Sequence, residues 1–457
     1  MYIVGQERRL VDPPSQVVAG VRTVTTNMDG RDALPRMSRP FAFCRASTPI
    51  ENHSRARIRL FCQQILRISG DFFPMHKLKI SLKPNPRTSE INIGKGIRRQ
   101  LGQLIPFKPR RVGIISNERV LGLYGREVVR SLKAEGCQTF VWLMPEGERY
   151  KSFRVLKQAV TFLSENHFER DDLVLALGGG VVGDLAGFSS AIYLRGLPLT
   201  QVPTTLLSQI DSSVGGKTGI NLPVGKNLVG AFHQPAAVFI DPETLLSLPQ
   251  RELVSGFCEM VKQSLVSNKS LFDLTVNCLE NQGQKRDFLL TSKFENLIAA
   301  QCRFKASIVA SDERESTNRS DAKSRRVLNF GHTTAHALET VTNYRVFRHG
   351  EAVGYGMLVA GELSRNLGLL DAGDLKLLRD AVHLCGPLPR ADKLDINQII
   401  GALKHDKKSV AGQINWVLLE GVGRPKIVEG RLISAKMLRL SLRAGLRAPD
   451  RQKENFN

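Results

Sequence analysis

The chain has 457 residues, of which 42% are hydrophobic and 24% are charged, a composition typical of globular proteins. This length exceeds one ordinary domain, so we expect two domains and some additional chain. No apolar run reaches the roughly 18 residues that a membrane span needs, and the first residues do not resemble a signal peptide. The net charge is +22, but basic residues are spread along the chain without a nucleic-acid-binding pattern. We therefore expect neither a nucleic-acid nor a membrane partner.

The seven cysteines are scattered, odd in number and never spaced as C-x-x-C. This pattern argues against a disulfide framework and against a thiolate zinc site. It predicts free thiols in a reducing compartment, and hence a cytoplasmic protein.

Residues 1–76 differ from the rest, because arginine is the basic residue used there, apart from histidine, and the first lysine is Lys77. A disordered tail, a basic arm and a targeting peptide are all compatible with this composition. We favour an over-extended start, with translation beginning at Met37 or Met75.

From Lys77 the pattern alternates between strands and helices. It predicts strands at 77–82, 112–116, 138–143 and 173–177, and helices at 94–104, 127–135 and 153–166. Such alternation is typical of a parallel sheet with crossover helices. We expect an α/β domain over 77–242.

The pattern becomes mainly helical after about Asp241. It predicts helices at 250–266, 293–310, 333–341, 351–367 and 374–384, and a late pair of strands at 414–419 and 426–428. We expect a second, helical domain over 243–457, whose last residues, about 15 of them, form a flexible tail.

A glycine-rich turn follows the predicted strand at 173–177. Gly178, Gly180 and Gly183 fit the G-x-G-x-x-G dinucleotide fingerprint, in which glycines let the backbone approach a pyrophosphate at a helix N-terminus. The acidic residue expected roughly 20 residues later is absent from 199–204. A tight left-handed turn is the alternative interpretation.

The stretch 201–221 is dense in hydroxyl, glycine and charged residues, and Lys226 and Asn227 follow it closely. We expect a loop, because helix-forming residues are sparse and apolar residues are too few for a core strand. Ordering such a loop is costly unless it binds a ligand, and hydroxyls with two lysines suit a phosphate. A plain surface loop is the alternative.

A metal constellation follows in the helical region. Glu259 precedes Lys262 by three residues, His332 precedes His336 by four, and His349 comes 13 residues later. Glu259, His332 and His349, or a subset with His336, form a His₂Glu set that is typical of catalytic zinc. No H-E-x-x-H motif is present, which argues against a metalloprotease. Core histidines are the alternative.

Four segments form a set of motifs: Asp211-Ser-Ser-Val-Gly-Gly-Lys-Thr-Gly219, Gly256-x-x-Glu259-x-x-Lys262, Leu328-Asn-Phe-Gly-His-Thr333 and His349-Gly-Glu-Ala-Val353. Together they resemble 3-dehydroquinate synthase, a family of the sugar phosphate cyclase superfamily. The resemblance spans about 77–428. It implies a Rossmann-like NAD-binding domain followed by a helical domain that binds metal and substrate.

The resemblance also implies a reaction, that of a carbon-oxygen lyase in the shikimate pathway. A small phosphorylated sugar acid, the heptulosonate phosphate DAHP, is transiently oxidised by NAD, loses phosphate, is reduced again and closes its ring to 3-dehydroquinate. NAD and Zn²⁺ (or Co²⁺) are the implied cofactors, and a homodimer is the implied assembly.

The resemblance assigns roles to matching positions. The metal ligands are Glu259, His332 and His349. The nucleotide positions are Glu148, Lys151, Gly179, Gly180, Val181, Val182, Gly183, Asp184, Thr204, Thr205, Asp211, Lys217, Lys226, Asn227, Thr244 and Ser247. The substrate positions are Arg195 (donated across the dimer interface), Lys217, Lys262, Lys305, Glu315, Arg325, Asn329, His336 (the proton carrier), Lys407 and Lys408.

Two assignments stay open. A longer polar stretch follows Glu315, so the substrate arginine is Arg319, Arg325 or Arg326, and the spacing to Asn329 favours Arg325. We do not choose between Lys407 and Lys408. The rival functions are another sugar phosphate cyclase, a metal-dependent polyol dehydrogenase of the same fold and a non-catalytic basic binding protein.

Overall fold

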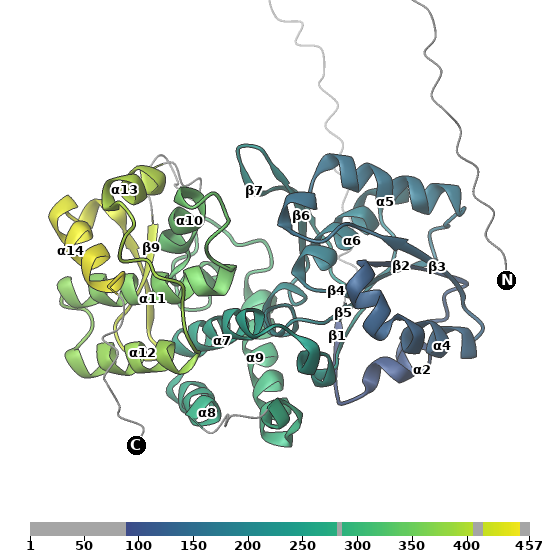
Figure 1. Cartoon of the computed structure of the whole chain (residues 1–457), viewed down its shortest axis with the longest axis horizontal. Helices are drawn as coiled ribbons and strands as arrows, with labels where there is room; N and C mark the ends of the chain where they lie inside the picture. Colours follow the sequence, from purple (N-terminus) through teal and green to yellow (C-terminus); the bar gives the residue numbers. More distant parts are fainter. Residues whose placement is uncertain (1–87, 281–285, 405–414, 448–457) are drawn as a thin grey trace, which may run out of the picture. The chain divides into compact units, whose positions relative to one another are not determined.

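Six parallel strands form the main sheet, in the order β1-β8-β5-β4-β2-β3 (Figure 1). The computed structural model describes residues 88–280, 286–404 and 415–447, which all belong to one compact unit, Pro84–Asn457. The predicted parallel sheet is confirmed. Our expectations for 1–76 and for a strand at 77–82 concern residues outside this description, as does the part of the expected C-terminal tail beyond residue 447.

The strands of the main sheet are β1 (Glu90–Ile93), β2 (Arg111–Ser116), β3 (Gln138–Leu143), β4 (Leu173–Gly178), β5 (Leu199–Pro203) and β8 (Ala237–Ile240). Two antiparallel pairs join β6 (Lys217–Leu222) to β7 (Gly225–Phe232) and β9 (Asn415–Leu419) to β10 (Pro425–Glu429). The helices of the sheet region are α2 (Leu101–Leu104), α3 (Glu118–Val120), α4 (Arg126–Ala134), α5 (Phe153–Glu165) and α6 (Gly180–Ile192). The later helices are α7 (Gln250–Leu265), α8 (Lys269–Glu280), α9 (Ser292–Ser311), α10 (His332–Val341), α11 (His349–Asn366), α12 (Ala372–Leu384), α13 (Ile396–Lys404) and α14 (Ala435–Gly445).

Helices cover both faces of the main sheet, as strand β4 shows. All six of its residues are buried, because successive side chains point to opposite faces and both faces are covered. Val174 and Ala176 pack with residues of α5 and α6. Leu173, Leu175 and Leu177 pack with residues of α2 and α4.

The chain order changes direction between β2 and β4, since β3 lies on one side of β2 and β4 on the other. In open parallel sheets, ligands bind beyond the carboxyl ends of the strands at such a switch point. The glycine turn after β4 therefore lies where the topology favours a ligand.

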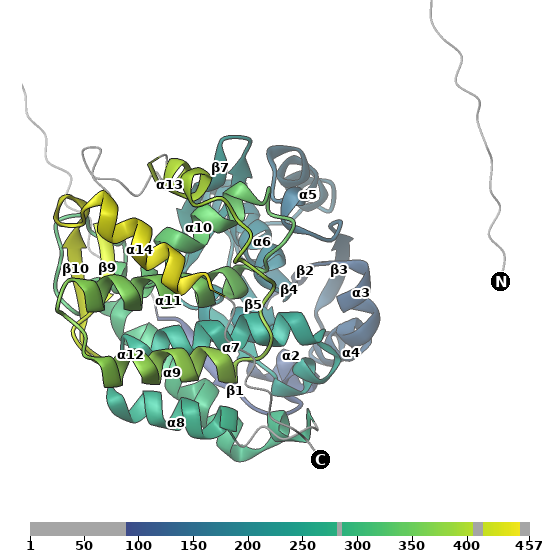
Figure 2. The same cartoon turned by 60° about the vertical axis from the view of Figure 1, so that its left-hand side comes forward.

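Helix α11 is the centre of the helical region. Every residue from Gly350 to Ser364 is buried, and the helix packs against α7, α10, α12, α14 and β9 (Figure 2). Among the described residues, no helix is long and apolar enough to cross a membrane.

Most predicted elements are confirmed within one or two residues at their ends, including the late strand pair. The loop predicted over 201–221 is wrong. It contains the last residues of β5, which is wholly buried, and all but the last residue of β6, which pairs with β7. The polar residues of this stretch are accommodated because its strands form backbone hydrogen bonds with neighbouring strands. A single sequence does not reveal that pairing.

The helix predicted over 94–104 is only partly correct. Gly96 has a left-handed φ of 74° and precedes a short 3-10 turn at Ile97–Gln100, which leads into α2. The predicted boundary between 242 and 243 follows β8 directly, and the division into two domains stays a prediction.

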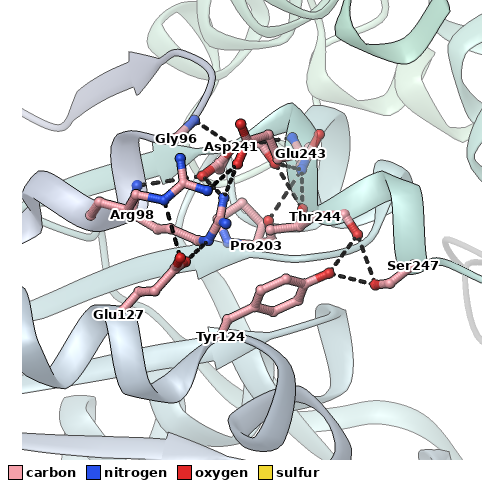
Figure 3. A network of polar contacts seen from close by, with 11 residues as sticks. Gly96, Arg98, Tyr124, Glu127, Pro203, Asp241, Glu243, Thr244 and Ser247 are labelled. Carbon is pink, nitrogen blue, oxygen red and sulfur yellow. Dashed lines mark hydrogen bonds and ion pairs between the residues drawn. The ribbon is translucent and has the colours of Figure 1, made fainter. Parts of the chain in front are cut away.

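A buried polar network anchors the end of β8 (Figure 3). The Asp241 carboxylate is fully buried and accepts hydrogen bonds from Gly96 N at 3.0 Å, Glu243 N at 3.0 Å and Arg98 Nη1 at 2.5 Å. Arg98 also pairs with Glu243 and with Glu127 on α4. Burial alone would lower the pKa of Arg98, but these carboxylates outweigh it and raise the pKa. The network ties the start of the sheet to the chain that enters the helical region.

The neighbouring residues Arg98 and Arg99 provide a matched test of this network. Both pair with Glu127 and Glu243, but the Arg98 side chain is 7% exposed and the Arg99 side chain 49%. We expect Arg98→Ala to lower the free energy of unfolding by about 3–5 kcal/mol, because it leaves buried Asp241 without its cation. Arg99→Ala should cost about 0–1 kcal/mol. Equal losses in urea unfolding would contradict the importance of the buried pair.

Candidate active site

The glycine turn joins β4 to helix α6. Gly179 is the N-cap residue, and no side chain caps the helix. The N–H groups of the first turn therefore have no acceptor within the helix and can bind an anion. The left-handed turn that was our alternative is wrong, because Gly179 is extended at φ −75°. Space favours glycine instead: a Cβ at Gly179 would lie 2.9 Å from Thr205 Cγ2, and one at Gly180 would lie 2.9 Å from Ser212 Oγ, so both side chains would have to shift.

Lys151 organises the polar groups beside this turn. Its side chain is 3% exposed, and Nζ lies 2.6 Å from Asp184 Oδ2 on α6, 2.6 Å from Asn227 Oδ1 on β7 and 3.4 Å from Glu148 Oε1. Asn221 completes the group by donating to Glu148 Oε1 at 2.8 Å. Burial alone would lower the pKa of Lys151, but attraction to Asp184 and Glu148 raises it. The predicted nucleotide positions at 148, 151, 184 and 227 therefore lie together.

Glu259, His332 and His349 also lie together. Glu259 is on α7, while His332 and His349 are the first residues of α10 and α11. One ligand atom from each lies within 4.8 Å of the others, and these three are the group that the described residues offer as a metal site. Nε2 of His349 is 3.7 Å from Glu259 Oε1, and Nε2 of His332 is 3.9 Å from the same atom.

The burial of Glu259 fits a bound cation. The residue is 1% exposed, and Oε1 accepts no hydrogen bond from any group in the described ranges. The other carboxylate oxygen, Oε2, forms an ion pair with Lys262, whose Nζ lies 2.6 Å away. A buried carboxylate oxygen without a donor is costly. Two imidazoles and one carboxylate form the usual protein ligand set of catalytic zinc.

Glycines allow the three ligand-bearing segments to approach one another. A Cβ at Gly350 would lie 1.9 Å from Ser255 O on α7, and a Cβ at Gly356 would lie 1.9 Å from Gly331 O, directly before His332. Gly331 itself has a φ of 76°, a left-handed conformation that strains other residues. Close backbone packing thus sets the spacing of Glu259, His332 and His349.

Two buried lysines lie beside the metal group. Lys305 Nζ is 2.8 Å from Asp211 Oδ1 and also contacts Asp211 O, while Lys262 pairs with Glu259. Burial lowers the pKa of Lys305 to about 8, despite the attraction of Asp211. Burial alone would raise the pKa of Asp211, but Lys305 and Lys262 hold it below its ordinary value.

Glu315 gathers a third set of predicted residues. Its carboxylate pairs with Lys217 and accepts a hydrogen bond from Asn329 Nδ2 at 2.6 Å. Its φ of 54° is left-handed, and strain of this kind is concentrated at functional sites. Arg325 is 3% exposed and donates to Gly215 O at 2.9 Å, two residues before Lys217.

Burial distinguishes the three arginines among which the sequence left the substrate position open. Arg319 and Arg326 donate to carbonyls of their own exposed segment. Arg325 alone among the three is buried, so it is the one placed to face the group around Glu315.

Comparison with known proteins decides the family. The model of the 3-dehydroquinate synthase N-terminal domain matches residues 141–255, and that of the C-terminal domain matches residues 256–409. A 3-dehydroquinate synthase of Thermodesulfovibrio yellowstonii is 41% identical over 357 residues, covering 77% of this chain and 96% of the relative. One from Rippkaea orientalis is 39% identical over 362 residues, covering 78% and 95%. The chain belongs to the 3-dehydroquinate synthase family.

Solved structures agree with this membership. A 2-deoxy-scyllo-inosose synthase in complex with carbaglucose-6-phosphate, NAD⁺ and Co²⁺ is 25% identical, with a TM-score of 0.65 over 78% of this chain and 96% of its own. A Streptomyces hygroscopicus 2-epi-5-epi-valiolone synthase with NAD⁺ and Zn²⁺ is 24% identical and has a TM-score of 0.70 over 80% and 98%. A Schizosaccharomyces pombe glycerol dehydrogenase has a TM-score of 0.55 at 15% identity, covering 81% and 91%. At 24% and 15% identity, the latter two show the fold alone.

Some family positions do not join these groups. Thr244 and Ser247 belong to the network of Figure 3, where Thr244 O and Ser247 Oγ contact the Tyr124 hydroxyl. Arg195 is exposed and lines an open hollow of about 420 Å³. Lys407 and Lys408 lie outside the described residues. Val182 packs in the core behind the glycine turn, and Val181 is partly buried against the same core.

Sequence reasoning assigned no role to three residues that the structure places at the site. Asn221 bonds to Glu148, Gln263 donates to Asp211 Oδ1 at 3.3 Å, and Glu339 contacts His349. A signal existed for Glu339, which follows His332 by seven residues and so shares its helical face. No comparable signal marks the other two.

The packing at Gly356 provides a test of the metal group. We expect Gly356→Ala to weaken Zn²⁺ binding about tenfold or more, because the added Cβ forces α11 away from Gly331 and misplaces His332. The measurement is competition with a chromophoric chelator. Gly401→Ala on α13 is the control, since a Cβ there meets nothing within 4 Å. Unchanged affinity in Gly356→Ala would show that this contact does not set the ligand spacing.

Proposed function

We propose that this protein is a 3-dehydroquinate synthase, which converts DAHP to 3-dehydroquinate and phosphate. The observation that carries the proposal is the position of Lys262, buried between the candidate metal ligand Glu259 and the Asp211–Lys305 pair. The candidate metal ligand Glu259 and the cation Lys262, which suits an anionic substrate, thus lie on one face of α7. A polyol dehydrogenase of this fold has no phosphate to bind and no need for such lysines. Family membership at about 40% identity supports the same reaction.

NAD and Zn²⁺ or Co²⁺ are the proposed cofactors. The uncapped start of α6 and the Lys151 group would hold the nucleotide, and Glu259, His332 and His349 would hold the metal. When bound, NAD supplies a reversible hydride acceptor, and the metal supplies a Lewis acid for the substrate oxygen. The inosose synthase that resembles this chain was solved with NAD⁺ and Co²⁺.

The buried cations suit the loss of phosphate. Lys262, Lys305 and Arg325 are at most 5% exposed, so their interaction with a phosphate is weakly screened by water. Fixed cations of this kind stabilise the charge that develops on a leaving group without reorganising. They would bind the phosphate and carboxylate of the sugar acid and orient its ring.

His336 is the proposed proton carrier. Its ring centroid lies 5.6 Å from that of His332 and 6.3 Å from that of His349, so it is adjacent to the metal group without belonging to it. An imidazole beside the bound substrate is able to accept a proton from carbon or deliver one to oxygen near neutral pH.

A cytoplasmic homodimer is the proposed form. The five described cysteines are free thiols, which suits a reducing compartment. Arg195 and its neighbour Leu194 have left-handed φ values of 69° and 48°. Leu194 and nearby Ile192 are exposed, as is Phe232 on β7, which lines the same hollow as Arg195. Such a strained, partly apolar surface suits an interface that delivers Arg195 to a second copy. Sedimentation equilibrium tests it; a monomer at assay concentrations would exclude the dimer.

The reaction itself is tested with purified full-length protein, DAHP, catalytic NAD and Zn²⁺. We expect equal amounts of phosphate and 3-dehydroquinate, loss of both with a chelator, and no net accumulation of NADH, since the cofactor is regenerated in each cycle. Steady NADH accumulation from a polyol would indicate a dehydrogenase. Phosphate release only from sedoheptulose 7-phosphate would indicate another cyclase.

The pKa of Lys305 predicts a pH dependence. This lysine is cationic below about pH 8 and neutral above it, so its attraction for the anionic substrate is lost as pH rises. We expect kcat/KM, which reports the free enzyme, to fall above about pH 8. Lys305→Arg keeps its charge at every accessible pH and should shift this decline upward, even if its activity at pH 7 is lower. The same decline in both proteins would assign it to another group.

A further inference from the structure

The two histidines of the metal group turn the same ring nitrogen toward Glu259. In both, Nε2 is the atom nearest Glu259 Oε1, at 3.9 Å for His332 and 3.7 Å for His349. Nδ1 must then point away from the metal position. What contacts each Nδ1 decides how firmly the ring is held.

The partners of the two Nδ1 atoms differ in kind. His332 Nδ1 lies 3.1 Å from the backbone carbonyl of Phe330. His349 Nδ1 lies 3.4 Å from Oε1 of Glu339. Glu339 is on the last turn of α10 and is 2% exposed. A histidine that donates Nδ1–H to such a partner keeps the Nε2 lone pair for a metal, and a carboxylate partner makes the imidazole a stronger ligand than a carbonyl does.

Glu339 has a second contact that explains how its charge is tolerated inside the protein. Lys226 Nζ lies 3.0 Å from Glu339 Oε1 and 4.3 Å from the centre of the Tyr344 ring. Lys226 belongs to β7, so it reaches Glu339 from the hairpin that also carries Asn227 of the nucleotide group. Glu339 Oε1 thus contacts both the imidazole of His349 and the ammonium group of Lys226.

We propose that Glu339 is a positioning residue, which holds His349 by Nδ1 in the orientation and tautomer that bind the metal, with Lys226 as its counter-ion. The inference rests on the proposed metal centre and adds to it a residue outside the ligand set. Glu339 acts through His349 and does not touch the metal. Its effect is therefore on metal affinity and ligand field, and rates change only as a consequence.

Three variants of the full-length protein separate the two contacts. Glu339→Ala removes both. Glu339→Gln keeps an oxygen that accepts from Nδ1–H but loses the charge. Lys226→Met removes the ion pair and leaves the contact with His349. The probes are Zn²⁺ affinity of the metal-free protein, by chelator competition, and the visible absorption spectrum of the Co²⁺-loaded protein.

We expect Glu339→Ala to weaken Zn²⁺ binding about 10–100-fold, the usual effect of losing such a partner, and to change the Co²⁺ spectrum. Glu339→Gln should restore most of the affinity, because the acceptor is regained. Lys226→Met should stay within about threefold of wild type, because His349 is still held and a nearby cation has been removed. Circular dichroism of the metal-free proteins shows whether each variant is folded.

Glu362→Gln is the matched control. Glu362 is a buried acid on α11, the helix of His349, but its partner is Arg379. We expect its Zn²⁺ affinity and Co²⁺ spectrum to match wild type.

Two results would overturn the inference. Wild-type affinity in a folded Glu339→Ala protein would show that His349 needs no such partner. An equal loss in Lys226→Met would show that the ion pair, rather than the contact with Nδ1, matters. Failure of the proposed metal centre is distinguishable, since the wild type and a His332→Ala variant would then bind Zn²⁺ equally weakly.

Discussion

The buried carboxylate of Glu259 is the constraint on which the site depends. It lies on α7 with 1% exposure, its Oε1 accepts no hydrogen bond from the described residues, and an isolated charge in such a place is strongly destabilising. Its neighbours are the ammonium group of Lys262, which offsets the charge, and two imidazoles at the starts of α10 and α11. The backbones of these helices approach closely enough because glycines occupy their contacts.

Opposite charges continue outward from this point in both directions. On one side, Lys262 and Lys305 flank Asp211. On the other, His349 leads to Glu339, and Glu339 to Lys226. Each buried charge has a partner, which is the condition under which charged groups are tolerated in an interior. The cations needed for an anionic substrate are thereby kept in place before the substrate binds.

The β6–β7 hairpin connects the cofactor side to the metal side. Asn227 bonds to Lys151 beside the glycine turn, whereas its neighbour Lys226 reaches Glu339 on α10. At the other end of the hairpin, Lys217 pairs with Glu315. Two strands thus carry three groups to partners in different parts of the chain. These contacts explain why so polar a segment is ordered, because its polar side chains pair with charged residues of other elements.

The sequence by itself determined the elements with strong periodicity and the motifs whose residues are close along the chain. The buried run of β4, the glycine turn after it and the histidine spacing of α10 are local patterns, so they were readable without a structure. The strands β5, β6 and β7 were not, because β5 is ordered between β4 and β8, and the polar residues of β6 and β7 are satisfied by pairing with each other. The tertiary structure showed which groups meet: Glu259, His332 and His349 come together without His336, Arg325 is buried whereas Arg319 and Arg326 are not, and Glu339 contacts His349. The metal group depends on the packing of α11 against α10 and against α7, where Gly350 N donates to Ser255 Oγ, 95 residues away in the chain. No local pattern encodes such contacts.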